Sequence, residues 1–317
     1  MNRRPELQDI LAAAERVEPH IHKTPIHTCR SIDRLAEAQL FFKCENFQKV
    51  GAFKFRGACN AVFSLSESEA RRGVATHSSG NHAAAIALAA RRRGIPAHIV
   101  MPVNAPKVKQ DAVAGYGGKI TWCEPTVESR EQTVARVIEQ TGATFIHPYN
   151  DERVIAGQGT VALELFDQVS ELEVVIAPVG GGGLVSGVAI VAASLSRSTR
   201  ILGAEPREAD DACRSLQAGR IMPAVEPHRT LADGLRTSLG PLTFGIIQEL
   251  VNEIITVSEE SIVQAMRTIW ERMKIIVEPS AAVVLAAMMR GQLDLQGKRI
   301  GLILSGGNVD LEALPWC

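Results

Sequence analysis

Two features of the sequence have residue types that can do chemistry: a run of four glycines and a lysine in an apolar segment. The glycines are Gly180, Gly181, Gly182 and Gly183. They follow an apolar, β-branched run at 174–179 and precede an alanine-rich tract at 184–193. Strand, glycine loop and helix form an anion site, because glycines admit close approach and a helix N-terminus presents unpaired N–H groups. The arrangement predicts a bound phosphate.

Two common phosphate loops do not fit this glycine run. A nucleotide P-loop ends in Gly-Lys-Ser or Gly-Lys-Thr, whereas Leu184 and Val185 follow Gly183 here. A dinucleotide fingerprint needs glycine at its sixth place, where this chain has Val185 or Ser186. Glu205 lies where a ribose-binding acid would fall, so a nicotinamide-dependent oxidoreductase stays open as a remote alternative. A glycine-rich turn without a ligand is the structural alternative.

Lys54 stands in the segment Gly51-Ala52-Phe53-Lys54-Phe55, which is an apolar setting for an ammonium group. Burial disfavours the charged form and lowers the pKa of a lysine, which suits Schiff-base chemistry. The same lysine on an amphipathic helix could instead extend its stem along apolar surface toward water. Beside a phosphate site in an α/β protein, a nucleophilic lysine suggests pyridoxal phosphate.

The elements that must position these residues alternate between strands and helices. Repeated βαβ units predict the α/β class, with two lobes that are each an open, mostly parallel sheet flanked by helices. We expect a large cofactor-binding domain of residues 1–67 and 150–317, and a small substrate-side domain of residues 68–149. Because ligands bind at the carboxyl ends of parallel strands, loops 76–82, 179–183 and 305–308 are expected to converge in a cleft between the lobes. Strands are predicted at 40–44, 73–77, 97–101, 119–123, 174–179, 200–205 and 299–304, and helices at 58–65, 81–93, 105–116, 127–141, 157–169, 244–250, 261–274 and 280–289.

The composition narrows the class of partner. The chain has 34 Lys and Arg against 35 Asp and Glu, so no basic excess points to nucleic acid or a membrane surface. No apolar run reaches the ~18 residues of a membrane span, and the N-terminus has no apolar signal region. The six cysteines lack CxxC spacing, which argues against a zinc site or a disulfide framework. We therefore expect a cytoplasmic protein with a small-molecule substrate.

Four motifs in order resemble the serine/threonine dehydratase and serine racemase group of fold-type II pyridoxal-phosphate enzymes. They are Lys54 with its flanks, Ser-Ser-Gly-Asn-His at 78–82, the glycine run with Leu184, and Ser-Gly-Gly-Asn at 305–308. The resemblance extends from Thr24 to Asp310. It implies pyridoxal phosphate as cofactor, an amino acid as substrate and a homodimer.

The resemblance also implies a role for each cofactor-binding residue. Lys54 would form the Schiff base and then take the proton from the substrate Cα. Phe53 would flank the cofactor ring, Asn81 would hydrogen-bond its 3-hydroxyl, and the four glycines would bind its phosphate. Ser305 would face the pyridine nitrogen, where a hydroxyl supports a neutral ring and favours prompt loss of a β-leaving group.

On the substrate side, the resemblance implies a loop that holds the substrate carboxylate. Ser79 also matches the serine that racemases place opposite the lysine, and two proton carriers on opposite faces permit racemisation; a serine that only binds the carboxylate is the alternative. Arg130 matches a substrate-domain arginine that pairs on closure, although by itself it is typical of a solvated helix residue. The residues implied in substrate binding are Ser78, Ser79, Asn81, His82, Arg130 and Thr237.

An acidic segment after the strand at 200–205 matches the divalent-cation site of racemase-type members. Glu205, Asp211 and the carbonyl of Ala209 would supply oxygen ligands, which suit Mg²⁺ or Ca²⁺. An acidic surface turn is the alternative.

The resemblance predicts a pyridoxal-phosphate ammonia-lyase that converts L-serine, L-threonine or 3-hydroxyaspartate to the 2-oxo acid and ammonia. Serine racemisation in the same site is the first alternative, and a phosphate-binding module without catalysis ranks below both. Ala84 stands where the family usually has glutamine, and 236–238 is Arg-Thr-Ser. Because of these departures, the resemblance does not define the pocket for the substrate side chain. Because the chain stops at Cys317, we do not expect the regulatory domain of biosynthetic threonine dehydratases.

Overall fold

The larger of two sheets has six strands in the order β1-β2-β10-β7-β8-β9. The computed structural model describes residues 3–78, 80–227, 229–289 and 294–316. β1 is antiparallel to β2, and the other neighbours are parallel. The strands are β1 (Ile26–His27), β2 (Gln39–Cys44), β7 (Val174–Pro178), β8 (Arg200–Pro206), β9 (Glu253–Val257) and β10 (Arg299–Leu304).

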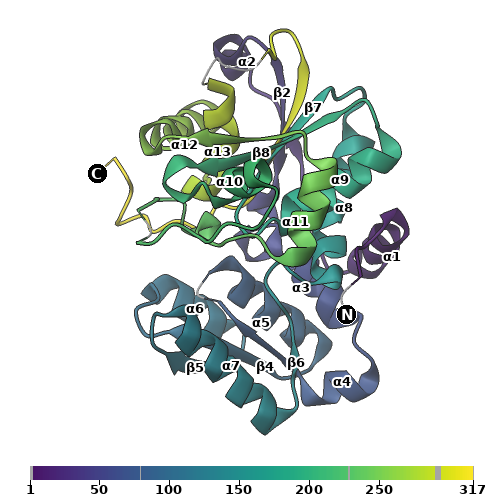
Figure 1. Ribbon diagram of the computed structural model, residues 1–317, viewed down its shortest axis with the longest axis vertical. Helices are drawn as coiled ribbons and strands as arrows, with labels where there is room; N and C mark the ends of the chain where they lie inside the picture. Colours follow the sequence, from purple (N-terminus) through teal and green to yellow (C-terminus); the bar gives the residue numbers. More distant parts are fainter. Residues whose placement is uncertain (1–2, 79, 228, 290–293, 317) are drawn as a thin grey trace.

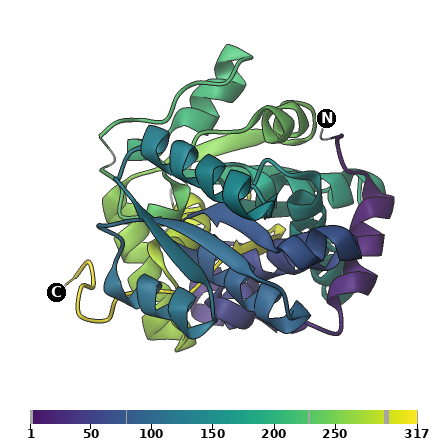
Figure 2. The same cartoon turned by 90° about the horizontal axis from the view of Figure 1, so that it is seen from below.

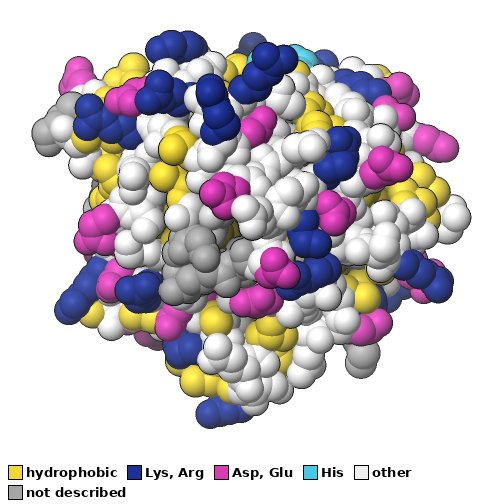
Figure 3. All heavy atoms as spheres, turned by 90° about the horizontal axis from the view of Figure 1, so that it is seen from above, with side chains coloured by type: hydrophobic (Ala, Val, Ile, Leu, Met, Phe, Trp, Pro, Cys, Tyr) yellow, Lys and Arg dark blue, Asp and Glu magenta, His cyan; other side chains and the backbone are white. Residues whose placement is uncertain are grey.

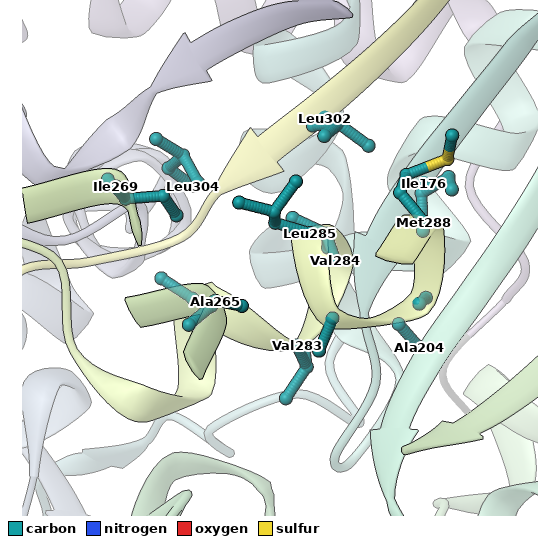
Figure 4. Packing of buried hydrophobic residues seen from close by; sticks show 14 of the residues in the cluster. Ile176, Ala204, Ala265, Ile269, Val283, Val284, Leu285, Met288, Leu302 and Leu304 are labelled. Atoms are coloured by element: carbon teal, nitrogen blue, oxygen red, sulfur yellow. The ribbon is translucent and has the colours of Figure 1, made fainter. Parts of the chain in front are cut away.

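Helices cover both faces of this sheet because alternate side chains of each buried strand point to opposite sides. Ile176 and Leu302 pack against α2, α12 and α13, whereas Val175 and Ile303 pack against α1, α8, α9 and α11. Figure 4 shows the first of these cores, with side chains of α13 between the strands and α12. The helices of this lobe are α1 (Leu7–Val17), α2 (Arg30–Ala36), α8 (Glu152–Gln168), α9 (Gly183–Leu195), α10 (Asp211–Ala218), α11 (Pro241–Leu250), α12 (Glu259–Met273) and α13 (Pro279–Met289).

The small lobe lies below the large one in Figure 1 and has four parallel strands in the order β5-β4-β3-β6. Helices lie on both sides of this sheet (Figure 2), with α5 and α6 packed on one core and α7 on the other. The elements are β3 (Val74–His77), β4 (Ala97–Pro102), β5 (Lys119–Cys123), β6 (Thr144–Phe145), α4 (Glu67–Arg72), α5 (Asn81–Arg93), α6 (Lys107–Gly115) and α7 (Val127–Thr141).

Helix α3 (Lys54–Phe63) joins the two lobes. Its Phe55 and Val62 belong to the core that contains α5, while its other side lies against α8. A Cβ on Gly157 of α8 would lie 2.6 Å from the Cα of Gly57, so the two helices approach too closely for a side chain there. This contact places the start of α3 between the sheets.

The predicted α/β class, with two mostly parallel sheets flanked by helices, is confirmed. The helix expected from residue 58 begins at Lys54, so the lysine is the first residue of a helix and not part of the preceding loop. The helix expected from residue 157 begins at Glu152, because the Asp151 carboxylate accepts hydrogen bonds from the N–H groups of Arg153 and Val154. Strands β1, β6 and β9 and helices α1, α2, α4 and α10 were not predicted. The division into 1–67 with 150–317 and 68–149 stays a prediction, although each sheet lies within one of these parts.

Charged side chains of both signs are interspersed over the face shown in Figure 3. Among the described residues, no helix combines the length and the apolar character of a membrane span.

Candidate active site

The start of α3 is fastened to the end of β10. The N–H of Phe53 donates to the Ser305 carbonyl at 2.9 Å, and Ala52 forms a β-bridge with Gly306. The helix therefore begins at the carboxyl edge of the large sheet, where α/β proteins place their ligands.

Lys54 is half-buried, and its Nζ donates to the carbonyl of Pro148 at 3.1 Å. The amine lies 5.2 Å from the ring centre of Phe53. Burial lowers the pKa of Lys54 to about 8, and the negative charge of Glu278 opposes this shift. A much larger fraction of neutral amine is therefore present near neutral pH than in an ordinary lysine.

The glycine run lies between β7 and α9, as expected. Gly182 has φ +86°, which favours glycine, and it caps the N-terminus of α9. A Cβ on Gly181 would lie 2.2 Å from the ring of Tyr149, and one on Gly183 would lie 3.1 Å from the Tyr149 Cβ. A Cβ on Gly180 would meet the backbone of Leu235 at 3.0 Å. Every position in the loop is therefore crowded by a neighbour.

The backbone N–H groups of this loop indicate an anion-binding site. Within the part of the chain that the structure describes, the N–H groups of residues 180–185 donate to no protein acceptor. Residues 181–185 are buried, and buried N–H groups normally have a partner. A phosphate would satisfy these groups and interact with the positive end of the α9 dipole.

Asn81 is the first residue of α5 and is held by two residues from the large lobe. Its Nδ2 donates to Glu278 Oε1 at 2.9 Å, and its Oδ1 accepts from Asn308 Nδ2 at 2.9 Å. Glu278 is buried just before α13, and burial raises the pKa of its carboxyl to about 7. The amide of Asn81 is thus fixed in orientation across the junction of the lobes.

The other predicted substrate residues lie on the small-lobe side or in the loop before α11. Ser78 Oγ accepts from the N–H of Gly80 at 3.2 Å, while Ser79 lies outside the described residues. His82 is buried, and burial holds its pKa well below the usual range. Its Nε2 lies 3.4 Å from the Ile146 carbonyl, as in a histidine packed in a core. Its contact with substrate stays a prediction.

Arg130 and Thr237 come from opposite lobes. Arg130 lies on α7, is half-buried, and donates from Nε to the Thr126 carbonyl at 3.3 Å. Thr237 follows the short helix at Asp233–Leu235 in the large lobe, and its Oγ1 lies 3.4 Å from where a Cβ of Gly180 would be. The structure therefore places Thr237 next to the glycine loop.

The expected metal ligands are gathered at the end of β8. Glu205 is buried and accepts hydrogen bonds from the N–H groups of Cys213 at 2.7 Å and Ala212 at 3.3 Å. Asp211 Oδ2 is buried and has no hydrogen-bond partner, and Ala209 lies in the short helix between them. No three His, Cys, Asp or Glu side chains form a metal-binding group in the described ranges, so a cation here also needs a carbonyl ligand.

Comparison with known proteins identifies the family. The sequence profile of a family described as "Pyridoxal-phosphate dependent enzyme" matches residues 17–306. The chain belongs to this pyridoxal-phosphate-dependent family. It is 53% identical to the β-hydroxyaspartate dehydratase of Paracoccus denitrificans over 312 residues, covering 98% of this chain and 99% of the relative. It is 50% identical to the serine racemase of Arabidopsis thaliana over 321 residues, covering 99% of this chain and 97% of the relative.

A solved structure agrees with these relatives. The structure of maize serine racemase has a TM-score of 0.96 and 49% identity, over 98% of this chain and 95% of that one. The predicted resemblance to the dehydratase and racemase group is therefore confirmed. Membership also selects pyridoxal phosphate over the nicotinamide alternative.

The residues present fit pyridoxal phosphate. One edge of the large sheet holds both the glycine loop and the amine of Lys54. The loop has no room for side chains, and its N–H groups are unpaired. Ser305 is buried at the same edge, and its hydroxyl makes no hydrogen bond to the residues that the structure describes.

Sequence reasoning missed three residues that complete the site and assigned no role to a fourth, Asn308, although its motif was recognised. Glu278 and Asn308 orient Asn81, the Pro148 carbonyl accepts from Lys54, and the ring of Tyr149 covers the glycine loop. One signal was available for two of them, because 147–151 is a polar His-Pro-Tyr-Asn-Asp segment directly after the end of a strand.

Proposed function

We propose that this pyridoxal-phosphate enzyme is an ammonia-lyase that dehydrates a β-hydroxy-α-amino acid to the 2-oxo acid and ammonia. L-Serine, L-threonine and 3-hydroxyaspartate are the candidate substrates. The observation that carries the proposal is the juxtaposition of the Lys54 amine, the unpaired N–H groups of the glycine loop and the Ser305 hydroxyl. The relative named as a β-hydroxyaspartate dehydratase supports it.

Each residue has a defined task in this proposal. Pyridoxal phosphate, when bound, supplies the electron sink that stabilises negative charge at the substrate Cα. The N–H groups of Gly180–Gly183 would hold its phosphate, Phe53 would lie beside its ring, and Asn81 would hydrogen-bond its 3-hydroxyl. Lys54 removes the Cα proton as its neutral amine, because burial lowers the pKa of this group to about 8.

The leaving group is a β-hydroxyl, and the hydroxyl of Ser305 matches that chemistry. A serine facing the pyridine nitrogen would not keep it protonated as a carboxylate would. The neutral ring would withdraw electrons less strongly and would stabilise negative charge at Cα less. Loss of the β-hydroxyl is then favoured over a long-lived carbanion.

Serine racemisation in the same site is the second candidate. The relatives named as serine racemases support it. It requires a second proton carrier on the face opposite Lys54, and Ser79 is the proposed group. Ser79→Ala should abolish inversion of the substrate while elimination from the L-substrate survives. Equal loss of both activities would argue against two proton carriers on opposite faces.

We also propose a divalent cation, Mg²⁺ or Ca²⁺, held by Glu205, Asp211 and the Ala209 carbonyl. The buried, unpartnered Asp211 Oδ2 supports it, since a cation would satisfy that oxygen. The role would be structural or activating, away from the chemistry. A homodimer located in the cytoplasm completes the proposal.

The test is release of 2-oxo acid and ammonia from a panel of L- and D-β-hydroxy amino acids, with and without a chelator. Lys54→Ala should lose both turnover and the visible absorbance of bound pyridoxal phosphate. Lys119→Ala, at an exposed position of β5, is the matched control and should change neither. Retained visible absorbance and turnover in Lys54→Ala would refute the assignment.

A further inference from the structure

The segment 146–151 connects the small lobe to the large one and is anchored at both ends. At its start, the N–H of Ile146 donates to the Ala75 carbonyl of β3 at 2.9 Å. At its end, helix α8 of the large lobe begins. Between these anchors lies Pro148, whose carbonyl accepts from Lys54 Nζ at 3.1 Å. The backbone of this segment therefore decides where the lysine amine is held.

The side chain of His147 fixes the middle of the segment. Its Nδ1 accepts hydrogen bonds from the N–H groups of Tyr149 at 3.3 Å and Asn150 at 2.9 Å. The imidazole itself packs nearly at right angles against the rings of His77, Phe145 and Tyr149, with ring centres between 4.6 and 6.2 Å apart. Packing thus holds the ring, and the ring holds two backbone N–H groups.

A single peptide group links His147 to Lys54. It joins Pro148 to Tyr149, and it is not among the cis bonds of the described residues. Its N–H donates to His147 Nδ1, and its carbonyl accepts from Lys54 Nζ. A trans peptide group is planar, with its N–H and its carbonyl pointing in opposite directions. The hydrogen bond at one end therefore fixes the direction of the acceptor at the other end.

The two hydrogen bonds to Nδ1 require a neutral imidazole. Because two N–H groups point at Nδ1, the ring proton lies on Nε2. Burial lowers the pKa of His147 to about 4, and the nearby His77 and Lys54 lower it further. The charge of Asp151 opposes this shift. The lone pair of Nδ1 is therefore available as an acceptor throughout the neutral pH range.

We propose that His147 is a positioning residue for Lys54, and that it acts by fixing the peptide group whose carbonyl holds the lysine amine. This rests on the proposed function, in which Lys54 takes the proton from the substrate Cα. One N–H of the neutral amine donates to the Pro148 carbonyl, so the lone pair that accepts the proton keeps one direction. Without the fixed carbonyl the amine can turn about its Cε–Nζ bond. Proton transfer then becomes slower while substrate binding is unchanged.

Two variants of His147 separate the hydrogen bonds from the packing. His147→Phe keeps an aromatic ring against its neighbours but has no acceptor. His147→Asn loses the ring but keeps a side-chain oxygen near the position of Nδ1, as in turns where asparagine accepts from the N–H two residues on. His98→Phe, at a half-buried position of β4, is the matched control.

The expected order of activities follows from the role of the acceptor. The kcat should fall about 10- to 100-fold in His147→Phe at nearly constant KM, and less than about threefold in His147→Asn. His98→Phe should change neither value. The opposite order, with the phenylalanine variant active and the asparagine variant impaired, would mean that His147 only fills space and would overturn the proposal.

Single-turnover rates give a readout that a merely structural defect does not change, because they do not depend on the fraction of active enzyme. The rate constant for the best substrate of the panel should fall in His147→Phe, and deuterium at the substrate Cα should slow it further. Absence of that isotope effect in His147→Phe would show that a step other than proton transfer had been slowed, and the proposal would fail.

Visible circular dichroism of bound pyridoxal phosphate gives a readout without turnover, since it depends on how Lys54 holds the cofactor. At equal cofactor content the signal should change in His147→Phe and stay as in the wild type in His147→Asn. An unchanged signal in His147→Phe would overturn the proposal. If His147→Phe does not fold, His147→Asn decides: a kcat within about threefold of the wild type supports the proposal, and a larger loss overturns it. If the wild type turns over no substrate, the proposed function fails, and the dichroism alone tests the positioning role.

Discussion

Replacement of Arg56 by methionine should destabilise the protein strongly, because its charge is buried within a neutral cluster. Arg56 lies two residues after Lys54 and its side chain has no exposed surface. It donates to Glu45 Oε2 from Nε at 2.8 Å, and to the Glu164 oxygens at 2.7 and 2.8 Å. Lys43 donates to Glu164 at 2.6 Å, so the cluster has two cations and two anions. Removing Arg56 leaves one negative charge without compensation.

The expected magnitude follows from this imbalance. Breaking a buried pair by removing one partner costs ~3–5 kcal/mol, whereas methionine keeps most of the apolar packing. With an entropy of unfolding of about 2 cal/mol/K per residue over 317 residues, this lowers the melting temperature by roughly 4–8 °C. The hydrogen bonds of Arg56 fix the orientation of α3, which also carries Lys54. The variant should therefore also retain less pyridoxal phosphate.

The assay is thermal unfolding of the apoenzyme, since bound cofactor would itself shift the transition. Arg267→Met is the control, because the Arg267–Glu271 pair is exposed on α12 and its loss should not change the melting temperature measurably. A second change, Glu45→Gln, should recover part of the loss in Arg56→Met by removing the uncompensated charge. A loss below about 1 kcal/mol, or no recovery in the double variant, would refute the reasoning.

Three further predictions concern the site. Gly181→Ala places a Cβ against the Tyr149 ring and should weaken cofactor binding at least about 10-fold in an absorbance titration, while Gly245→Ala, with open space around it, should not; equal affinities would contradict the crowding. The rate at which the apoenzyme captures pyridoxal phosphate should rise with pH as the Lys54 amine loses its proton and level off above about 8, the pKa set by burial; a stopped-flow rate still rising toward the usual lysine value of 10.5 would refute this. Added Mg²⁺ or Ca²⁺ should raise the melting temperature of the wild type and leave Asp211→Asn unchanged, and the same rise in both would exclude Asp211 as a ligand.

Local patterns were sufficient for the fold class and the family. Apolar β-branched runs followed by alanine-rich tracts predicted most of the strands and helices, because burial on both faces removes polar residues from such segments. The glycine run could be recognised as an anion site from the lack of side chains alone. Polar segments with a helix-capping aspartate were harder, and α8 was predicted five residues too short at its start for this reason.

Only the tertiary structure decided which distant residues complete the site. Glu278 lies 197 positions from Asn81, and Tyr149 covers glycines more than 30 positions away, so no local pattern links them. Burial of Arg56 and the pKa of Lys54 likewise depend on what packs around them, which a linear sequence does not state. The sequence alone determined which groups can do chemistry, since this depends on residue type. Their orientation and charge depend on neighbours that the fold supplies.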